Sequence, residues 1–136
     1  MADLAPTGTT IGSKTTRKID AQFGEAVVEN DVVYRDGATG KYKKADTDLS
    51  LAAATSVGIV LVGGALDAWG IVATDGLVIL AGVAMVPGDA HYLSGTPGKI
   101  QLQADLAPGD FVSYLGGAVS ATGLDLSIKN YGILLV

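Results

Sequence analysis

Few residues of this chain have the type and spacing that enzyme chemistry requires. His91 is the only histidine and cysteine is absent, so a Ser-His-Asp triad would depend on this imidazole, and thiolate metal sites are excluded. No serine stands in a nucleophile-elbow pattern. Glu25 and Glu29 are the only glutamates, and their acid–base partners would have to be turn aspartates. We therefore expect no catalytic residues, metal or cofactor, and a His91 that is packed or lies at the surface.

Two short segments carry parts of ligand-binding motifs without the rest. Asp46 and Asp48 are spaced as in a calcium loop, but the glycine and glutamate that complete such a loop are missing. The segment from Gly37 to Lys41 has the glycines and lysine of a phosphate-binding loop. However, no Ser or Thr follows the lysine, and no strand leads through the segment into a helix. Both segments are predicted to be turns.

The lysine-containing turn belongs to a stretch that occurs twice, 58 residues apart. Residues 31–41 match residues 89–99, with Asp, Tyr, two Gly and Lys at the same positions, and the register holds without a gap over 24–67 and 82–125. An internal duplication explains this match, and chance agreement among common turn residues is the alternative. We expect two related halves in which Tyr34 and Tyr92 lie in equivalent environments.

Each copy predicts a β-hairpin. A strand that carries the tyrosine runs into a turn with two glycines and returns through the lysine, as in a hairpin with a four- or five-residue loop. Gly40 and Gly98 can take the positive φ angles that such loops need. The repeat is therefore interpreted as part of a scaffold.

Composition favours an all-β fold in a single domain. The 136 residues include 19 glycines and only 17% charged residues, and no long segment rich in Glu, Lys and Arg predicts a helix. Apolar runs at 57–62, 70–74 and 77–85 and alternating runs at 99–103 and 124–129 predict strands. We expect residues 19–136 to form one all-β domain made of two related halves.

The charge distribution argues against nucleic-acid and membrane partners. The net charge is −5, and residues 45–136 carry eight aspartates and only two lysines, with no basic stripe interleaved with aromatic residues. Residues 49–66 are eighteen uncharged residues, which is the lower limit for a membrane helix. Glycine, serine and threonine dilute this run, so two strands and a turn are predicted instead. The first ten residues lack the features of a secretory signal.

The two ends of the chain and its single tryptophan are candidate contact elements. Residues 1–18 are rich in Thr, Ser, Gly and Pro and predict a flexible N-terminal arm, either a disordered tail or a segment that orders on a partner. Residues 133–136 are apolar to the end, which predicts a paired strand or a subunit contact. Trp69 is expected to be a core or interface anchor.

Residues 20–65 resemble a known family. The strings Gly24-Glu25-Ala26-Val27, Asp31-Val32-Val33-Tyr34, Gly40-Lys41-Tyr42, Ala45-Asp46 and Val57-Gly58-Ile59-Val60 are similar to a progression found in the head-decorating cement proteins of tailed bacteriophages. The chain departs from that progression at Asn30, where glycine is usual, and at Val60, where alanine is usual.

The resemblance implies a compact β-sandwich or β-barrel-like body over residues 19–136, of the jelly-roll or β-tulip type. It further implies a structural protein on the outer surface of an icosahedral phage capsid, made in the host cytoplasm. It would bridge subunits of the major capsid protein and stabilise the shell, and it would associate with itself as a trimer or dimer at local symmetry axes. A head- or tail-fibre module that binds a host surface is the alternative, although such modules typically have a long stalk or heptad repeats, which are absent here. The candidate capsid- or subunit-contact residues are Thr9, Thr10, Ile11, Lys14, Arg17, Lys18, Trp69, Leu134 and Val136.

Overall fold

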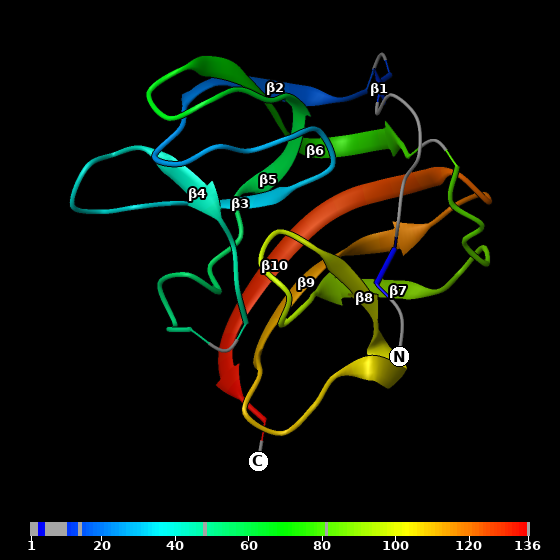
Figure 1. Ribbon diagram of the computed structural model, residues 1–136. Coiled ribbons are helices and arrows are strands. Elements are labelled where there is room, and N and C mark those ends of the chain that lie inside the picture. The colour runs from blue at the N-terminus through cyan, green and yellow to red at the C-terminus, as the bar shows by residue number, and fades with distance from the viewer. Residues whose placement is uncertain (1–2, 5–10, 14, 48, 81, 136) are drawn as a thin grey trace.

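The computed structural model describes residues 3–4, 11–13, 15–47, 49–80 and 82–135, and it confirms that the protein is nearly all β (Figure 1). One antiparallel sheet curls on itself like half of a barrel. Within the described residues there is no α-helix, and a single 3₁₀ turn, η1, covers Gln103–Asp105. The strands are β1 (Ile11–Gly12), β2 (Arg17–Gln22), β3 (Val32–Arg35), β4 (Tyr42–Lys44), β5 (Gly58–Val62), β6 (Trp69–Ile79), β7 (Ala90–Leu93), β8 (Ile100–Leu102), β9 (Phe111–Ala118) and β10 (Gly123–Leu134).

The order of the strands in the sheet divides it into two similar halves. The order is β4-β3-β5-β6-β10-β9-β7-β8, so each half runs from an outer hairpin to a long central strand. The central strands β6 and β10 pair with each other through Leu124 and Val78 and their neighbours. The first half lies in the upper part of Figure 1 and the second half in the lower part.

The two predicted hairpins are confirmed, and they have the same register. Tyr34 pairs with Lys43 between β3 and β4, and Tyr92 pairs with Gln101 between β7 and β8, each residue 58 positions from its counterpart. The next strand also matches, because Val33 pairs with Gly58 and His91 pairs with Gly116. Gly40 and Gly98 have φ angles of 74° and 77°. Whether the halves descend from one duplicated unit stays a prediction.

The structural correspondence between the halves ends after β5 in the first half and after β9 in the second half. Val60 pairs with Val72 in the first half, twelve residues later, whereas Ala118 pairs with Leu124 in the second half, six residues later. The connection in the second half is therefore shorter. As a result Leu66 lies in an exposed turn while Leu124, its match in the sequence, is fully buried in β10. Sequence matches beyond this point do not mark equivalent positions.

Two groups of buried apolar residues stabilise the fold. The larger group joins both halves and includes Val32, Ile59, Leu93, Leu115 and Leu124. The smaller group lies on the other face of the first half, where Phe23 packs with residues such as Val33, Val60 and Val72. The first half is thus packed on both faces, which explains the runs of consecutive apolar residues in β5 and β6.

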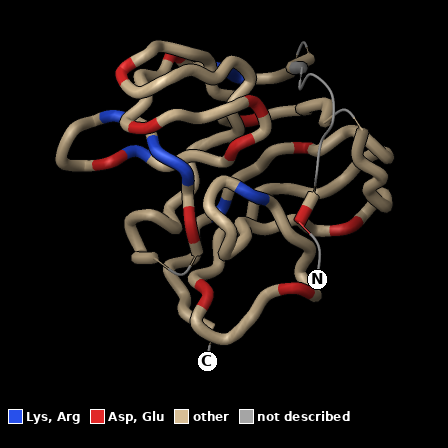
Figure 2. The backbone as a smooth tube through the Cα atoms, in the orientation of Figure 1, with Lys and Arg blue, Asp and Glu red and all other residues tan. Residues whose placement is uncertain are grey.

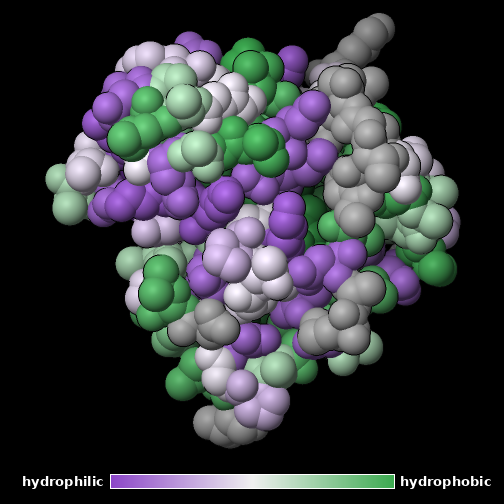
Figure 3. All heavy atoms as spheres, in the orientation of Figure 1, coloured by the Kyte–Doolittle hydropathy of each residue, from purple (hydrophilic) through white to green (hydrophobic). Residues whose placement is uncertain are grey.

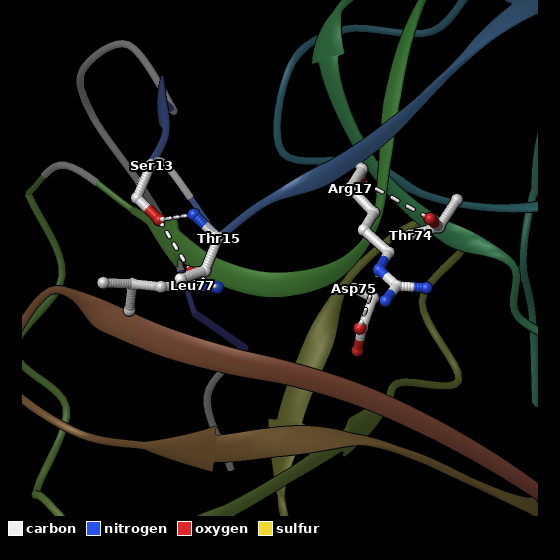
Figure 4. A network of polar contacts seen from close by, with 6 residues as sticks. All are labelled: Ser13, Thr15, Arg17, Thr74, Asp75 and Leu77. Atoms are coloured by element: carbon white, nitrogen blue, oxygen red, sulfur yellow. Dashed lines mark hydrogen bonds and ion pairs between the residues drawn. The ribbon is translucent and has the colours of Figure 1, made fainter.

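The described part of the predicted N-terminal arm contributes strands, so the sheet begins before residue 19. Ile11–Gly12 pairs with Val78 and Ile79 of β6, and β2 begins at Arg17. Between these strands, the Thr15 hydroxyl accepts the Leu77 N–H at 3.2 Å (Figure 4). The Thr16 hydroxyl donates to the Leu77 carbonyl. These side-chain hydrogen bonds take the place of backbone hydrogen bonds between strands. The segment can therefore pair with β6 although its sequence has no apolar periodicity.

Two further expectations for secondary structure need correction. The apolar runs at 70–74 and 77–85 were expected to be separate strands, but β6 is continuous through Gly76, and residues 82–86 form no strand. Gly76 has a φ of 90°, which lets the strand bend as Thr15 approaches its backbone. Residues 49–66 were expected to form two strands and a turn, but they contain one strand, β5, and residues 49–56 form turns and irregular backbone. No helix in the described ranges is long and apolar enough to cross a membrane.

Candidate interaction surface

The predicted contact residues that the structure describes come from different strands of the sheet. Trp69 begins β6 in the first half, whereas Leu134 ends β10 in the second half. Arg17 and Lys18 are exposed at the start of β2, and Ile11 lies in β1. Thr9, Thr10, Lys14 and Val136 lie outside the described residues. Figure 3 likewise shows apolar residues at several separate places on one face of the molecule.

The Trp69 surface consists of Val28, Val62 and Trp69. Trp69 is 66% exposed, so it is not a core residue. Val28 and Val62 are 62% and 50% exposed. Val62 lines two shallow hollows, one of about 550 Å³ shared with Val28 and one of about 390 Å³ shared with Trp69. The three side chains therefore border connected concave areas that a partner could fill.

Close backbone contacts hold this surface in shape. Val27 and Gly64 exchange two backbone hydrogen bonds of 3.0 Å, which fasten the loop that carries Val28 to the turn after β5. The Asp31 carboxylate accepts the Val28 N–H at 3.0 Å. Gly70 is required beside Trp69, because a Cβ there would lie 2.1 Å from the Val62 carbonyl oxygen. The role of the Asp31 carboxylate in this contact is therefore structural: it holds the turn at Val28.

The β10 surface consists of Tyr131, Ile133 and Leu134. Their side chains are 53%, 57% and 47% exposed, although Leu134 is paired with Phe111 of β9. The expectation of a paired apolar strand at the C-terminal end is thus confirmed up to Leu134. An apolar strand end that is paired and still exposed can contact a partner without unfolding.

A tyrosine pair lies next to the β10 surface. The rings of Tyr92 and Tyr114 are 5.5 Å apart and meet edge to face at 72°. Burial, with added effects of the nearby Tyr131 and Tyr114, raises the pKa of Tyr92. Tyr34 instead packs against the larger core. The expectation that Tyr34 and Tyr92 lie in equivalent environments is therefore wrong. The same face of the hairpin packs against different neighbours in the two halves.

Several basic side chains of the first half are paired with carboxylates. Lysine and arginine gather in this half (Figure 2). Arg17 lies 3.8 Å from Asp75, and Lys43 lies 3.0 Å from Asp36 (Figure 4 shows the first pair). The Ala38 N–H and Lys43 lower the pKa of Asp36, and Asp36 raises the pKa of Lys43. This pairing offsets the positive charge of the region.

His91, the imidazole that was considered for chemistry, lies inside the protein. It is fully buried, and neither ring nitrogen has a hydrogen-bond partner among the described residues. Burial lowers the pKa of His91, with a smaller opposite effect of Asp89. Among the residues that the structure describes, no group of His, Asp or Glu side chains is placed to hold a metal ion.

No protein-family model matches this chain, and no curated protein matches it.

Sequence reasoning missed Val28, Val62 and Tyr131 as surface residues, whereas Ile133 belongs to the C-terminal run that was expected to be a paired strand or a subunit contact. Val62 belongs to a continuous apolar run, which is also typical of a buried strand, so its exposure had no signal of its own. Tyr131 and Ile133 continue the series of every second residue that begins with Ser127 and Lys129. Residues two positions apart share one face of a strand, so this series could have identified the outer face of β10.

Proposed function

We propose that this chain is a structural protein of a tailed bacteriophage that binds the outer surface of the capsid. It bridges subunits of the major capsid protein and thereby stabilises the shell. Its place is the virion surface after synthesis in the host cytoplasm, and it associates with itself as a trimer or dimer at local symmetry axes. Neither nucleic acid nor a membrane is a partner in this proposal.

The observation that carries the proposal is the presence of exposed apolar surfaces on both halves. The Trp69 surface belongs to β5, β6 and the loop before β3, and the β10 surface belongs to the opposite half. Large exposed apolar side chains are typical of protein–protein contacts, and tryptophan and tyrosine often dominate their energetics. Two such surfaces on one body suit a protein that touches two neighbouring subunits.

The resemblance over residues 20–65 supports the same proposal, because its residues act in the scaffold. Asp31 holds the turn at Val28, and Gly58 allows β5 to approach β6 closely. In the proposal, the curled sheet is a compact β-barrel-like body of two related halves. In the proposal, residues 1–18 also contribute a contact to the capsid.

The second candidate is a head- or tail-fibre module that binds a host surface. The edge-to-face pair of Tyr92 and Tyr114 beside the exposed Tyr131 favours it, because aromatic side chains are suited to many kinds of surface contact. The two candidates predict different losses when the protein is removed.

The test is removal and add-back on phage particles. Binding that favours assembled capsid subunits stabilises the assembled form, by about 2.7 kcal/mol for each site at a ligand concentration of a hundred times Kd. Contact with two subunits adds to this through effective concentration. Particles without the protein should release DNA at a lower temperature and regain resistance when purified protein is added. If they withstand heat unchanged but lose attachment to host cells, the fibre function replaces the capsid function.

A further inference from the structure

The outer edge of β8 is covered by the start of the chain. β8 is the last strand in the sheet order, so one of its edges has no neighbouring strand among those described. The Leu4 N–H donates to the Ile100 carbonyl at 2.9 Å, and the Leu4 side chain packs against the larger core. Because an uncovered edge strand presents unpaired backbone groups, this contact protects the edge.

The first half covers the same position in a different way. Ile100 corresponds to Tyr42 in the repeat, and the Tyr42 carbonyl accepts the Gly24 N–H at 2.8 Å. Phe23 forms a parallel bridge with the same residue. The segment from Phe23 to Gly24 continues directly from β2, so it cannot leave β4 without disturbing β2. Leu4 is a separate segment that reaches β8 from the far end of the chain.

The contact of Leu4 is weakly held. In the described part of the chain, one backbone hydrogen bond and one apolar side chain attach it to β8 and the core. Asp3 lines a hollow of about 270 Å³ together with Asp105 and Asp110, so like charges lie near one another there. Nearby like charges disfavour each other. Both features make the segment easy to displace.

We propose that the β8 edge also accepts the Asp3–Leu4 segment of a second copy of this chain, in exchange for its own. The incoming segment makes the same contacts as the outgoing one, so exchange between copies costs little. Six residues lie between Leu4 and Ile11. The seven Cα-to-Cα steps that join Leu4 to Ile11 span at most about 25 Å when fully extended. The donor copy therefore lies directly beside the acceptor, and crowding of copies on one surface favours exchange.

Cysteine cross-linking between full-length chains tests this proposal, because the natural chain has no cysteine. Asp3→Cys and Ala107→Cys place one thiol each at the same hollow. Each variant is purified separately, with tags of different mass, and the two are mixed under mild oxidation. We expect the mixed disulfide dimer to form with a yield about tenfold above that of Asp3→Cys mixed with Ala65→Cys, an exposed control position, because seating of the segment raises the effective concentration of the thiols.

Leu4→Asp in the Asp3→Cys chain should abolish this excess, since a charged side chain cannot replace the packed leucine. A chain that carries both Asp3→Cys and Ala107→Cys reports whether the thiols can bond within one molecule. If this double variant closes internally while the mixture gives no excess over the control, the edge takes only its own segment and the proposal is wrong. A mixed yield that is insensitive to Leu4→Asp overturns it as well. No capsid is needed, so the result is independent of the proposed function.

Discussion

Asn30 and Gly88 occupy the same position in the two repeats and both have positive φ angles, of 80° and 94°. Each donates its N–H to the matching strand, Asn30 to Val60 at 2.9 Å and Gly88 to Ala118 at 2.7 Å. The side-chain oxygen of Asn30 is buried, and within the described ranges it has no hydrogen-bond partner. The backbone turn, and not the asparagine side chain, is therefore the shared structural requirement.

Asn30→Gly should raise the free energy of unfolding by about 1 kcal/mol, because it relieves both the left-handed strain and the unpaired buried oxygen. Gly88→Ala should lower it by about 1–2 kcal/mol through backbone strain alone, since no atom lies near the added Cβ. Urea unfolding of both variants measures these changes. A loss of stability in Asn30→Gly would contradict this account of the turn.

Gly58 and Gly116 should not tolerate alanine. A Cβ at Gly58 would lie 2.1 Å from the Ala73 carbonyl oxygen, and one at Gly116 would lie 2.1 Å from the Asp125 carbonyl oxygen. Each substitution must push two paired strands apart, which should cost about 2–3 kcal/mol or more. Gly37→Ala is the control, because nothing lies within 4 Å of its Cβ position. Thermal unfolding should rank Gly37→Ala near the natural chain and far above the other two.

His91 should make stability depend on pH in the acid range. Burial lowers its pKa in the folded state, so the unfolded chain binds the proton more readily below the ordinary value of 6.5. Stability is therefore full above that pH and falls as the pH decreases through the folded-state pKa. His91→Val, which copies the matching Val33, should flatten the profile of unfolding free energy between pH 7 and the folded-state pKa. An unchanged slope would assign the acid sensitivity to the carboxylates instead.

Asn130 should be essential to the junction between the halves. Its side chain accepts the Ser56 N–H at 3.0 Å, donates to the Ser56 carbonyl at 3.0 Å and accepts the Ser113 hydroxyl at 2.7 Å. Asn130→Ala removes the side-chain partner of the Ser56 N–H and carbonyl, while the Ser113 hydroxyl keeps its 2.8 Å contact with the Ser56 hydroxyl. The loss should lower the free energy of unfolding by about 2–3 kcal/mol. Lys129→Ala, at the exposed neighbouring position, should stay within about 0.5 kcal/mol in the same chemical-denaturation experiment.

The Trp69 surface can be tested with a pair of matched valines. Val28 and Val86 are 58 residues apart and 62% and 61% exposed, but of the two only Val28 lines the hollow beside Val62. If this surface binds the capsid, Val28→Ser should weaken co-sedimentation with stripped particles by about tenfold, through lost apolar burial. Val86→Ser should have little effect. Equal effects of the two variants would exclude the Trp69 surface as the contact.

The hairpins were predictable because their determinants are local. The turn glycines at 40 and 98 and the strand residues beside them act within a few positions, so the sequence repeat also specified the shared register. The outward alternation of Asp125 and Ser127 in β10 was visible for the same reason. The alternation of buried and exposed residues predicted for 99–103 is wrong at Gln101. This residue is buried and donates its side-chain N–H to the Leu93 carbonyl.

The sequence by itself thus determined the all-β class, the two hairpins and the turns that need positive φ. Only the tertiary structure decided which faces are covered: Tyr34 packs on the core while Tyr92 meets Tyr114, and Trp69 is exposed. It also decided that Ile11–Gly12 pairs with β6, and that the shorter second connection buries Leu124. Turn conformation depends on neighbours in the chain, whereas burial depends on segments that come from far away in the sequence and pack only once the sheet has curled.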